Sequence, residues 1–152
     1  MSYTYDYPRP AVTADCVVFG VDGKSLQILL VKRGNEPFKG GWAFPGGFMN
    51  MDETVEECAV RELYEETGLK LNRLKQLGCF SDVHRDPRGR VVSVAFYALA
   101  TPAEVRGGDD ASEARWFALE EVPHPLAFDH DDMLQKALQQ LRKDSHFDLE
   151  RG

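Results

Sequence analysis

A dense cluster of acidic residues on one short segment constrains this chain more than any other feature. The segment reads GGFMNMDETVEECAVRELYEETGL, residues 46 to 69, and the carboxylates of Glu62, Glu65 and Glu66 fall within five residues of it. Like charges at this spacing repel one another and oppose folding unless something compensates for them. The fold must therefore supply a counter-charge or a bound cation at this segment.

Most of the segment is predicted to be a helix with defined ends. Thr54 followed three residues later by Glu57 is the pattern of a capping box, in which each side chain accepts a hydrogen bond from the other residue's backbone. Gly68 marks the end of the helix, because glycine readily takes the left-handed conformation that closes a last turn.

The three carboxylates lie on one stripe of this helix. At about 100° per residue, Glu66 falls about 40° to one side of Glu62 and Glu65 about 60° to the other. Three small or apolar residues share the stripe: Val55, Cys58 and Ala59. Because an apolar stripe faces the protein body, the carboxylates are expected to continue it at the edge of the core.

Two interpretations of this acidic stripe remain open. It is either a solvated face that Arg61 partly neutralises, or the binding site of a hard cation such as Mg²⁺ or Mn²⁺, which prefers clustered oxygen ligands. The Pro-Gly-Gly break at residues 45–47 favours the cation. Glycines allow close backbone approach, and such a loop can offer a carbonyl to a metal or an amide, such as that of Gly47, to a phosphate.

The other elements predict a single α/β domain with mixed strands and helices. Apolar, β-branched runs predict strands at 12–20, 25–33, 74–83, 91–100 and 113–119, with a short apolar segment at 42–48. Apolar residues at helical spacing predict a second helix over 130–143. We expect an extended N-terminal arm at 1–10, the folded domain at 11–143 and a C-terminal tail at 144–152.

The composition and net charge limit which classes of partner this protein is expected to bind. A net charge of −7 argues against nucleic acid as the main partner, since proteins that bind it usually show a basic face, but it leaves room for a small phosphate ligand screened by a cation. Three cysteines without a CxxC pair are expected to be reduced core thiols. The four histidines lack metal-ligand spacing. With no signal peptide and no apolar run near ~20 residues, we expect a soluble, cytoplasmic protein without a membrane partner.

The acidic segment resembles the Nudix box of Nudix hydrolases. Gly47, five residues, Glu53, seven residues and then RELYEETGL match G-x5-E-x7-R-E-U-x-E-E-x-G-U at every defined position, where U is a bulky aliphatic residue. The resemblance implies an α/β/α sandwich with a mixed β-sheet. It also implies Mg²⁺- or Mn²⁺-dependent hydrolysis of a nucleoside diphosphate linked to another moiety, and a homodimer.

The resemblance implies a role for each matching residue. The expected metal ligands are Glu62, Glu66, Glu65 as a further ligand or support, and the carbonyl oxygen of Gly46. Glu53 and Arg61 are expected to form an ion pair that fixes the loop against the helix. The helical stripe indicates the three clustered carboxylates independently, whereas the role of Glu53 rests on the resemblance.

The segments around the box are similar to those of ADP-ribose pyrophosphatases and of the Nudix portion of regulators of NAD metabolism, which carry a DNA-binding domain. These segments are YPRPAVTADCVVFG, VKRGNEPFKGGWAFPGGF, RDPRGRVVSVAFYAL, EARWFAL and LAFDH. Because the sequence ends soon after LAFDH, we do not expect the DNA-binding domain of those regulators. Because the box is complete, we favour an enzyme that hydrolyses ADP-ribose to AMP and ribose 5-phosphate. The alternatives are another nucleotide sugar, an oxidised nucleoside triphosphate, or a non-catalytic module that senses ADP-ribose.

Arginine and aromatic residues outside the box are candidates for substrate binding. Arg33 and the loop residues Arg85, Arg88 and Arg90 offer guanidinium groups that suit phosphate oxygens, although a solvated hairpin loop explains the loop residues equally well. Aromatic candidates for stacking on an adenine are Trp42, Phe38, Tyr3, Tyr5 and Tyr7. Candidates for the general base are Glu65, Asp109, Asp110 and Glu113.

Overall fold

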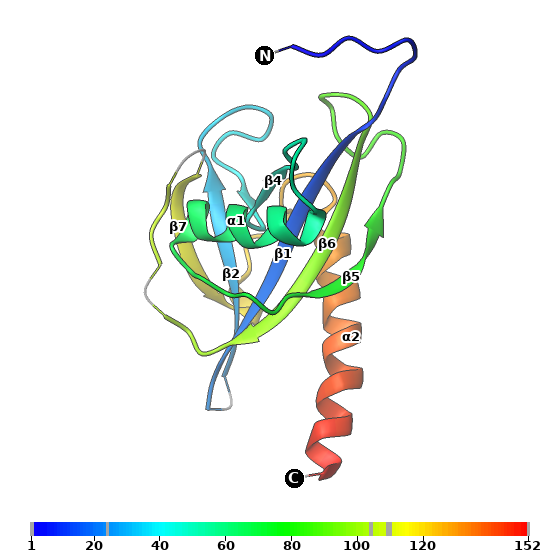
Figure 1. The fold of residues 1–152 in the computed structure, drawn as a ribbon. Helices are drawn as coiled ribbons and strands as arrows, with labels where there is room; N and C mark the ends of the chain where they lie inside the picture. Colours follow the sequence, from blue (N-terminus) through cyan, green and yellow to red (C-terminus); the bar gives the residue numbers. More distant parts are fainter. Residues whose placement is uncertain (1, 24, 104, 109–110, 152) are drawn as a thin grey trace.

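Strand β1 (Ala11–Asp22) lies at the centre of the molecule, because its alternate side chains enter two different cores. Val17 packs in one apolar cluster with helix α2 (His130–Arg151), and Val18 packs in another with helix α1 (Val55–Thr67). Successive side chains of a strand point to opposite faces of its sheet. The two helices therefore cover opposite faces of one sheet (Figure 1).

A computed structural model describes residues 2–23, 25–103, 105–108 and 111–151, with side chains up to residue 144. The elements besides β1 and the two helices are β2 (Ser25–Arg33), β3 (Trp42–Ala43), β4 (Gly46–Phe48), β5 (Lys75–Phe80), β6 (Val91–Ala100), β7 (Ala111–Ala118) and one 3-10 turn, η1 (Leu119–Glu121). The sheet has the order β3-β2-β1-β6-β5, with β4 on β1 and β7 on β2. Strands β1 and β6 are parallel and the other pairs antiparallel. The predicted α/β/α sandwich with a mixed sheet is confirmed.

Strands β1 and β2 diverge, and this divergence creates the space for a site. They pair only where residues 19–22 meet residues 25–28. Beyond that point β4 pairs with residues 13–15 of β1, while β3 pairs with the end of β2. The predicted apolar segment 42–48 is thus two short strands separated by Phe44 and Pro45. They lie on opposite sides of the wedge-shaped space between β1 and β2, with β4 on β1 and β3 on β2.

Helix α1 has the predicted ends. Thr54 Oγ1 accepts a hydrogen bond from the backbone N–H of Glu57 at 3.1 Å, and Glu57 Oε1 accepts one from Thr54 N–H at 2.9 Å, which completes the capping box. Gly68, with φ 78°, closes the helix in the left-handed region. Helix α2 is longer than the predicted range 130–143, because residues 144–151 continue it.

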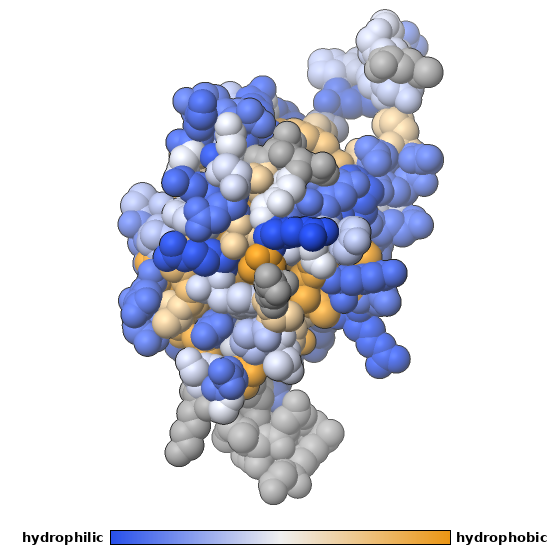
Figure 2. Space-filling view, turned by 90° about the vertical axis from the view of Figure 1, so that its left-hand side faces the viewer, coloured by the Kyte–Doolittle hydropathy of each residue, from blue (hydrophilic) through white to orange (hydrophobic). Residues whose placement is uncertain are grey.

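The N-terminal arm lies apart from the folded body. Residues 2–10 form no helix or strand and stand off from the body, whose face in Figure 2 is mostly hydrophilic with small scattered apolar areas.

Cys16 and Cys58 are buried free thiols, and burial raises the pKa of Cys58 to about 12. The prediction that all three cysteines are core residues is wrong for Cys79, which is exposed. No helix within the described ranges is long and apolar enough to cross a membrane.

Candidate active site

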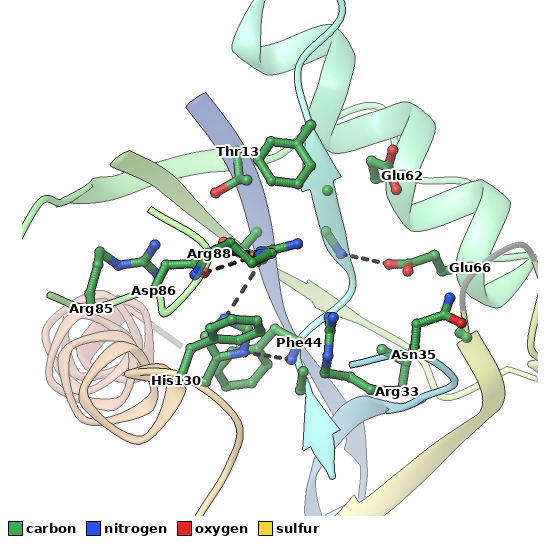
Figure 3. A pocket seen from close by; sticks show the side chains of 18 of the residues that line it. Thr13, Arg33, Asn35, Phe44, Glu62, Glu66, Arg85, Asp86, Arg88 and His130 are labelled. Carbon is green, nitrogen blue, oxygen red and sulfur yellow. Dashed lines mark hydrogen bonds and ion pairs between the residues drawn. The ribbon is translucent and has the colours of Figure 1, made fainter. Parts of the chain in front are cut away.

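A cavity of about 410 Å³ opens at the wedge between β1 and β2 (Figure 3). Helix α1 contributes Glu62 and Glu66 to one side of it. The loop 84–90 and the segment 126–130 contribute the opposite wall, with Arg85, Asp86 and His130. One cavity therefore joins side chains from both helical layers and from the diverging strands.

Two glycines bring the carboxylates of α1 against the backbone of β4. The N–H of Gly46 donates to Glu66 Oε1 at 2.7 Å, and Glu66 is only 6% exposed. A Cβ atom at Gly47 would lie 2.6 Å from the carboxyl carbon of Glu62, so a larger residue there would displace this carboxylate. Two carboxylates and a side-chain-free turn thus converge on the same side of the cavity.

Arg61 provides a counter-charge to this acidic side. Its Nε and Nη2 donate to the two carboxylate oxygens of Glu53 at 2.9 and 2.6 Å, and its Nη1 donates to Glu62 at 2.6 Å and to Glu65 at 3.1 Å. Nη2 also donates to the carbonyl of Phe48 at 3.1 Å, which ties the turn to the helix. The hydrogen bonds from Arg61 lower the pKa of Glu53 to about 2, against the opposing effect of burial.

One guanidinium cannot neutralise three carboxylates, so negative charge remains on this side of the cavity. In the described part of the chain, no three His, Cys, Asp or Glu side chains are arranged as a complete metal cluster. Magnesium commonly takes only one or two carboxylates and fills its other positions with water and substrate phosphates. Glu62 and Glu66, with the backbone at Gly46, are an all-oxygen donor set that fits Mg²⁺ or Mn²⁺.

The opposite wall is built around arginines that have carboxylate partners. Arg85, whose side chain is 3% exposed, donates through Nε and Nη2 to Asp129 at 2.9 and 2.7 Å, a bidentate pair that joins the loop 84–90 to the start of α2. Arg88 pairs with the buried Asp86 at 2.7 Å. Burial is the largest single effect on the pKa of Asp86 and raises it, but the hydrogen bonds from Arg88 and the charges of Arg88 and Arg85 together lower this pKa. Arg85 is thus engaged in the fold, while Arg88 reaches the cavity (Figure 3).

A sequence model described as the NUDIX domain matches residues 9–137 of this chain. The chain belongs to the Nudix family. It is 47% identical over 129 residues to the ADP-ribose pyrophosphatase of Methanocaldococcus jannaschii, which covers 85% of this chain and 73% of that protein. It is 40% identical to the ADPR responsive transcriptional repressor NtrR of Acinetobacter baylyi, covering 93% of this chain and 58% of the repressor.

A solved structure of a Nudix domain has the same fold. The NUDIX domain of Shewanella oneidensis NrtR, crystallised with ADP ribose, superposes with a TM-score of 0.84 at 34% identity, covering 90% of this chain and 94% of that one. The resemblance that the Nudix box indicated is therefore confirmed for the family and for the fold.

Several residues expected at the Nudix site do not line this cavity. Trp42 packs edge-on to Phe117, with ring centroids 4.8 Å apart, in the core on the α2 side. The side chain of Glu65 is 37% exposed and paired with Arg61. Other candidates outside the lining are Arg90, Glu113, Phe38, Tyr3, Tyr5 and Tyr7. Asp109 and Asp110 lie outside the described residues.

The cavity also contains residues that the sequence did not single out, above all Asp15 and His130. Asp15 accepts a hydrogen bond from Ser93 Oγ, and its Oδ1 lies 3.8 Å from His130 Nε2. His130 Nδ1 accepts the N–H of Phe44 at 3.0 Å, and burial lowers the pKa of His130, so the neutral ring that this contact needs is favoured. Asp15 carried a detectable signal, since it is a lone carboxylate in an apolar strand; His130 and Phe128 carried none.

Proposed function

We propose that this chain is a Mg²⁺-dependent (or Mn²⁺-dependent) pyrophosphohydrolase that cleaves the diphosphate of ADP-ribose to AMP and ribose 5-phosphate. The observation that carries the proposal is the 47% identity to an ADP-ribose pyrophosphatase over 85% of the chain. The geometry supports it, because clustered carboxylates face arginines across a cavity of about 410 Å³, a volume typical of small-molecule sites.

In this proposal Glu62, Glu66 and the carbonyl of Gly46 hold the metal, with Glu65 as a further ligand or support. A bound Mg²⁺ would neutralise developing negative charge and lower the pKa of a coordinated water. Arg61 keeps the helix and the β4 turn in register through Glu53 and the Phe48 carbonyl. The amide of Gly47 and the guanidinium groups of the opposite wall then orient the diphosphate.

Four residues remain candidates for the general base in the proposed reaction. Glu65 is held by Arg61 at 3.1 Å. Glu113 lies 3.8 Å from Arg115 and belongs to β7, whose first residue, Ala111, lines the cavity. The remaining two are Asp109 and Asp110. A variant in which a candidate is replaced by its amide identifies the base if it removes the acidic limb of the pH–rate profile, where the rate falls because the base becomes protonated.

The test is product analysis across a panel of nucleoside diphosphate derivatives with Mg²⁺, and again after chelation with EDTA. We expect AMP and ribose 5-phosphate from ADP-ribose, no turnover without metal, and recovery when Mg²⁺ or Mn²⁺ is restored. If GDP-mannose or a nucleoside triphosphate is cleaved while ADP-ribose is not, the substrate assignment is wrong and the Nudix chemistry remains.

A module that senses ADP-ribose without cleaving it is a second candidate. The 40% identity to an ADPR responsive repressor favours it, as does the likeness to a NUDIX domain crystallised with ADP ribose. A rise in melting temperature with ADP-ribose, without any product over hours, would select this function over hydrolysis.

The proposal also covers the partners, the oligomeric state and the cellular location of the protein. A net charge of −7 supports a small anionic substrate screened by a cation rather than nucleic acid. We further propose a homodimer and a cytoplasmic location. Light scattering coupled to size-exclusion chromatography tests the dimer directly.

A further inference from the structure

The aromatic ring of Phe128 lies beneath two guanidinium groups at the wall of the cavity. The Cζ atom of Arg33 is 4.9 Å from the centroid of this ring, and that of Arg88 is 5.2 Å from it. A guanidinium within about 6 Å of an aromatic centroid is attracted by the negative face of the ring. One aromatic ring therefore lies within cation–π range of two guanidinium groups.

The backbone holds Phe128 in this place from both sides. Its φ of 54° lies in the left-handed region, which a bulky residue occupies only where its surroundings fix it. The preceding residue, Ala127, donates its N–H to the carbonyl of Trp42 at 2.8 Å. The following residue, Asp129, is clamped by Arg85, and next to it His130 accepts the N–H of Phe44. The backbone that carries the ring is thus held by contacts with two separate parts of the chain, the segment 42–44 and the loop 84–90.

Each of the two arginines is held by a hydrogen bond or ion pair on one side of its guanidinium group, and the group points into the cavity. Arg33 Nε donates to the carbonyl of Pro37 at 2.7 Å, and its guanidinium extends into the cavity in Figure 3. Arg88 is bound to Asp86, and its guanidinium lies 4.7 Å from the ring of Phe48 as well as over Phe128. These charges face the carboxylates of α1 across the space where the diphosphate is proposed to bind.

We propose that Phe128 is a positioning residue, whose ring holds Arg33 and Arg88 so that both can bind the diphosphate of the substrate. The inference rests on the proposed function, because it takes a diphosphate as the ligand. Phe128 acts here through the arginines and makes no contact of its own with the nucleobase.

The test varies the electronic character of the ring at position 128 and keeps its shape. Phenylalanine carrying one, two or three ring fluorines is incorporated there, since fluorine withdraws electron density from the ring face with little change in size. Phe128→Leu removes the ring, and Phe128→Tyr retains it. KM and kcat are measured with ADP-ribose, and the Kd of inorganic pyrophosphate is measured by calorimetry in the presence of Mg²⁺.

We expect both KM and Kd to rise stepwise with each fluorine and to reach about three- to tenfold for Phe128→Leu, with Phe128→Tyr close to wild type. We expect kcat to stay within about twofold, because the arginines bind the ground state and the transition state alike. A matched control is Phe117 in β7, outside the cavity lining, where Arg115 lies 4.4 Å from the ring centroid. Fluorination there should change neither KM nor Kd.

Two results would overturn the inference. One is a KM and Kd that do not change with fluorination at position 128. The other is a change for ADP-ribose without a change for pyrophosphate, which would mean that the ring contacts the nucleobase. Failure of the proposed function is separate: a wild-type protein that binds pyrophosphate but releases no AMP refutes hydrolysis, and the pyrophosphate constants still decide the role of Phe128.

Discussion

Glu66 differs from the other clustered carboxylates in its surroundings. Glu53, Glu62 and Glu65 each contact Arg61, whereas Glu66 is buried and accepts the N–H of Gly46 at 2.7 Å. We expect Glu66→Gln to lower kcat by about two orders of magnitude or more, because the amide keeps a hydrogen-bond acceptor but loses the charge that a metal ligand needs. Steady-state kinetics with ADP-ribose and Mg²⁺ measure the effect.

The matched control for Glu66→Gln is Glu56→Gln, which makes the same chemical change at an exposed position in the first turn of α1. Both variants should keep the melting temperature within a few degrees of wild type. Turnover by Glu66→Gln at a rate near that of wild type would rule out Glu66 as a metal ligand.

Glu53 makes the stability of the protein depend on pH. Arg61 lowers the pKa of Glu53 to about 2, below its value of about 4.3 in an unfolded chain. The ionised carboxylate therefore stabilises the fold above about pH 5, and this contribution is lost as the pH falls toward 2. We expect the difference in unfolding free energy between wild type and Glu53→Gln to be largest at pH 6 and to shrink toward pH 3. A difference independent of pH would show that the ion pair adds no stability.

At the scale of elements, the carboxylates of α1 stay close to β4 only if the helix is fully formed. The caps at Thr54 and Gly68 stabilise both of its ends. Thr54→Ala removes the acceptor for the N–H of Glu57 and should lower the unfolding free energy by about 1 kcal/mol. Gly68→Ala should have a similar cost of about 1 kcal/mol, because alanine is strained at a φ of 78°. Urea denaturation measures both, with Thr4→Ala in the exposed arm as a control that should leave stability unchanged.

Elements with local sequence signals could be predicted, and contacts between distant segments could not. The capping box and Gly68 define α1 because each cap is formed within a few residues. Pro45 marks a break in the segment 42–48, but no local signal shows that β3 pairs with β2 and β4 with β1, because this depends on the divergence of β1 and β2. The continuation of α2 beyond residue 143 was missed because the apolar periodicity stops there.

The candidate site divides in the same way. The acidic side could be predicted, because Glu62 and Glu66 lie one helical turn apart and are adjacent in any helix. The opposite wall depends on contacts between residues 44 positions apart, such as Arg85 and Asp129, or 86 apart, such as Phe44 and His130. Arg85 was therefore predicted to bind substrate from its type alone, and only the fold shows its bidentate pairing with Asp129.

At the scale of the whole molecule, His130 joins the two sides of the wedge. It is the first residue of α2, accepts the N–H of Phe44 between β3 and β4, and lies 3.8 Å from Asp15 in β1. A single buried ring thus connects the layer of α2 to β1 and to the segment between β3 and β4. Its charge state should matter for the stability of the entire domain.

Burial lowers the pKa of His130, against the attraction of Asp15, so the folded protein favours the neutral ring. The unfolded chain takes up a proton first as the pH falls below about 6.5, and folding stability is lost there, while above that pH it is fully present. We expect the unfolding free energy of wild type to fall more between pH 7.5 and pH 5.5 than that of His130→Gln, as measured by urea denaturation. His84→Gln, at an exposed position, should retain the pH dependence of wild type. Parallel pH profiles for wild type and His130→Gln would contradict a neutral, buried His130.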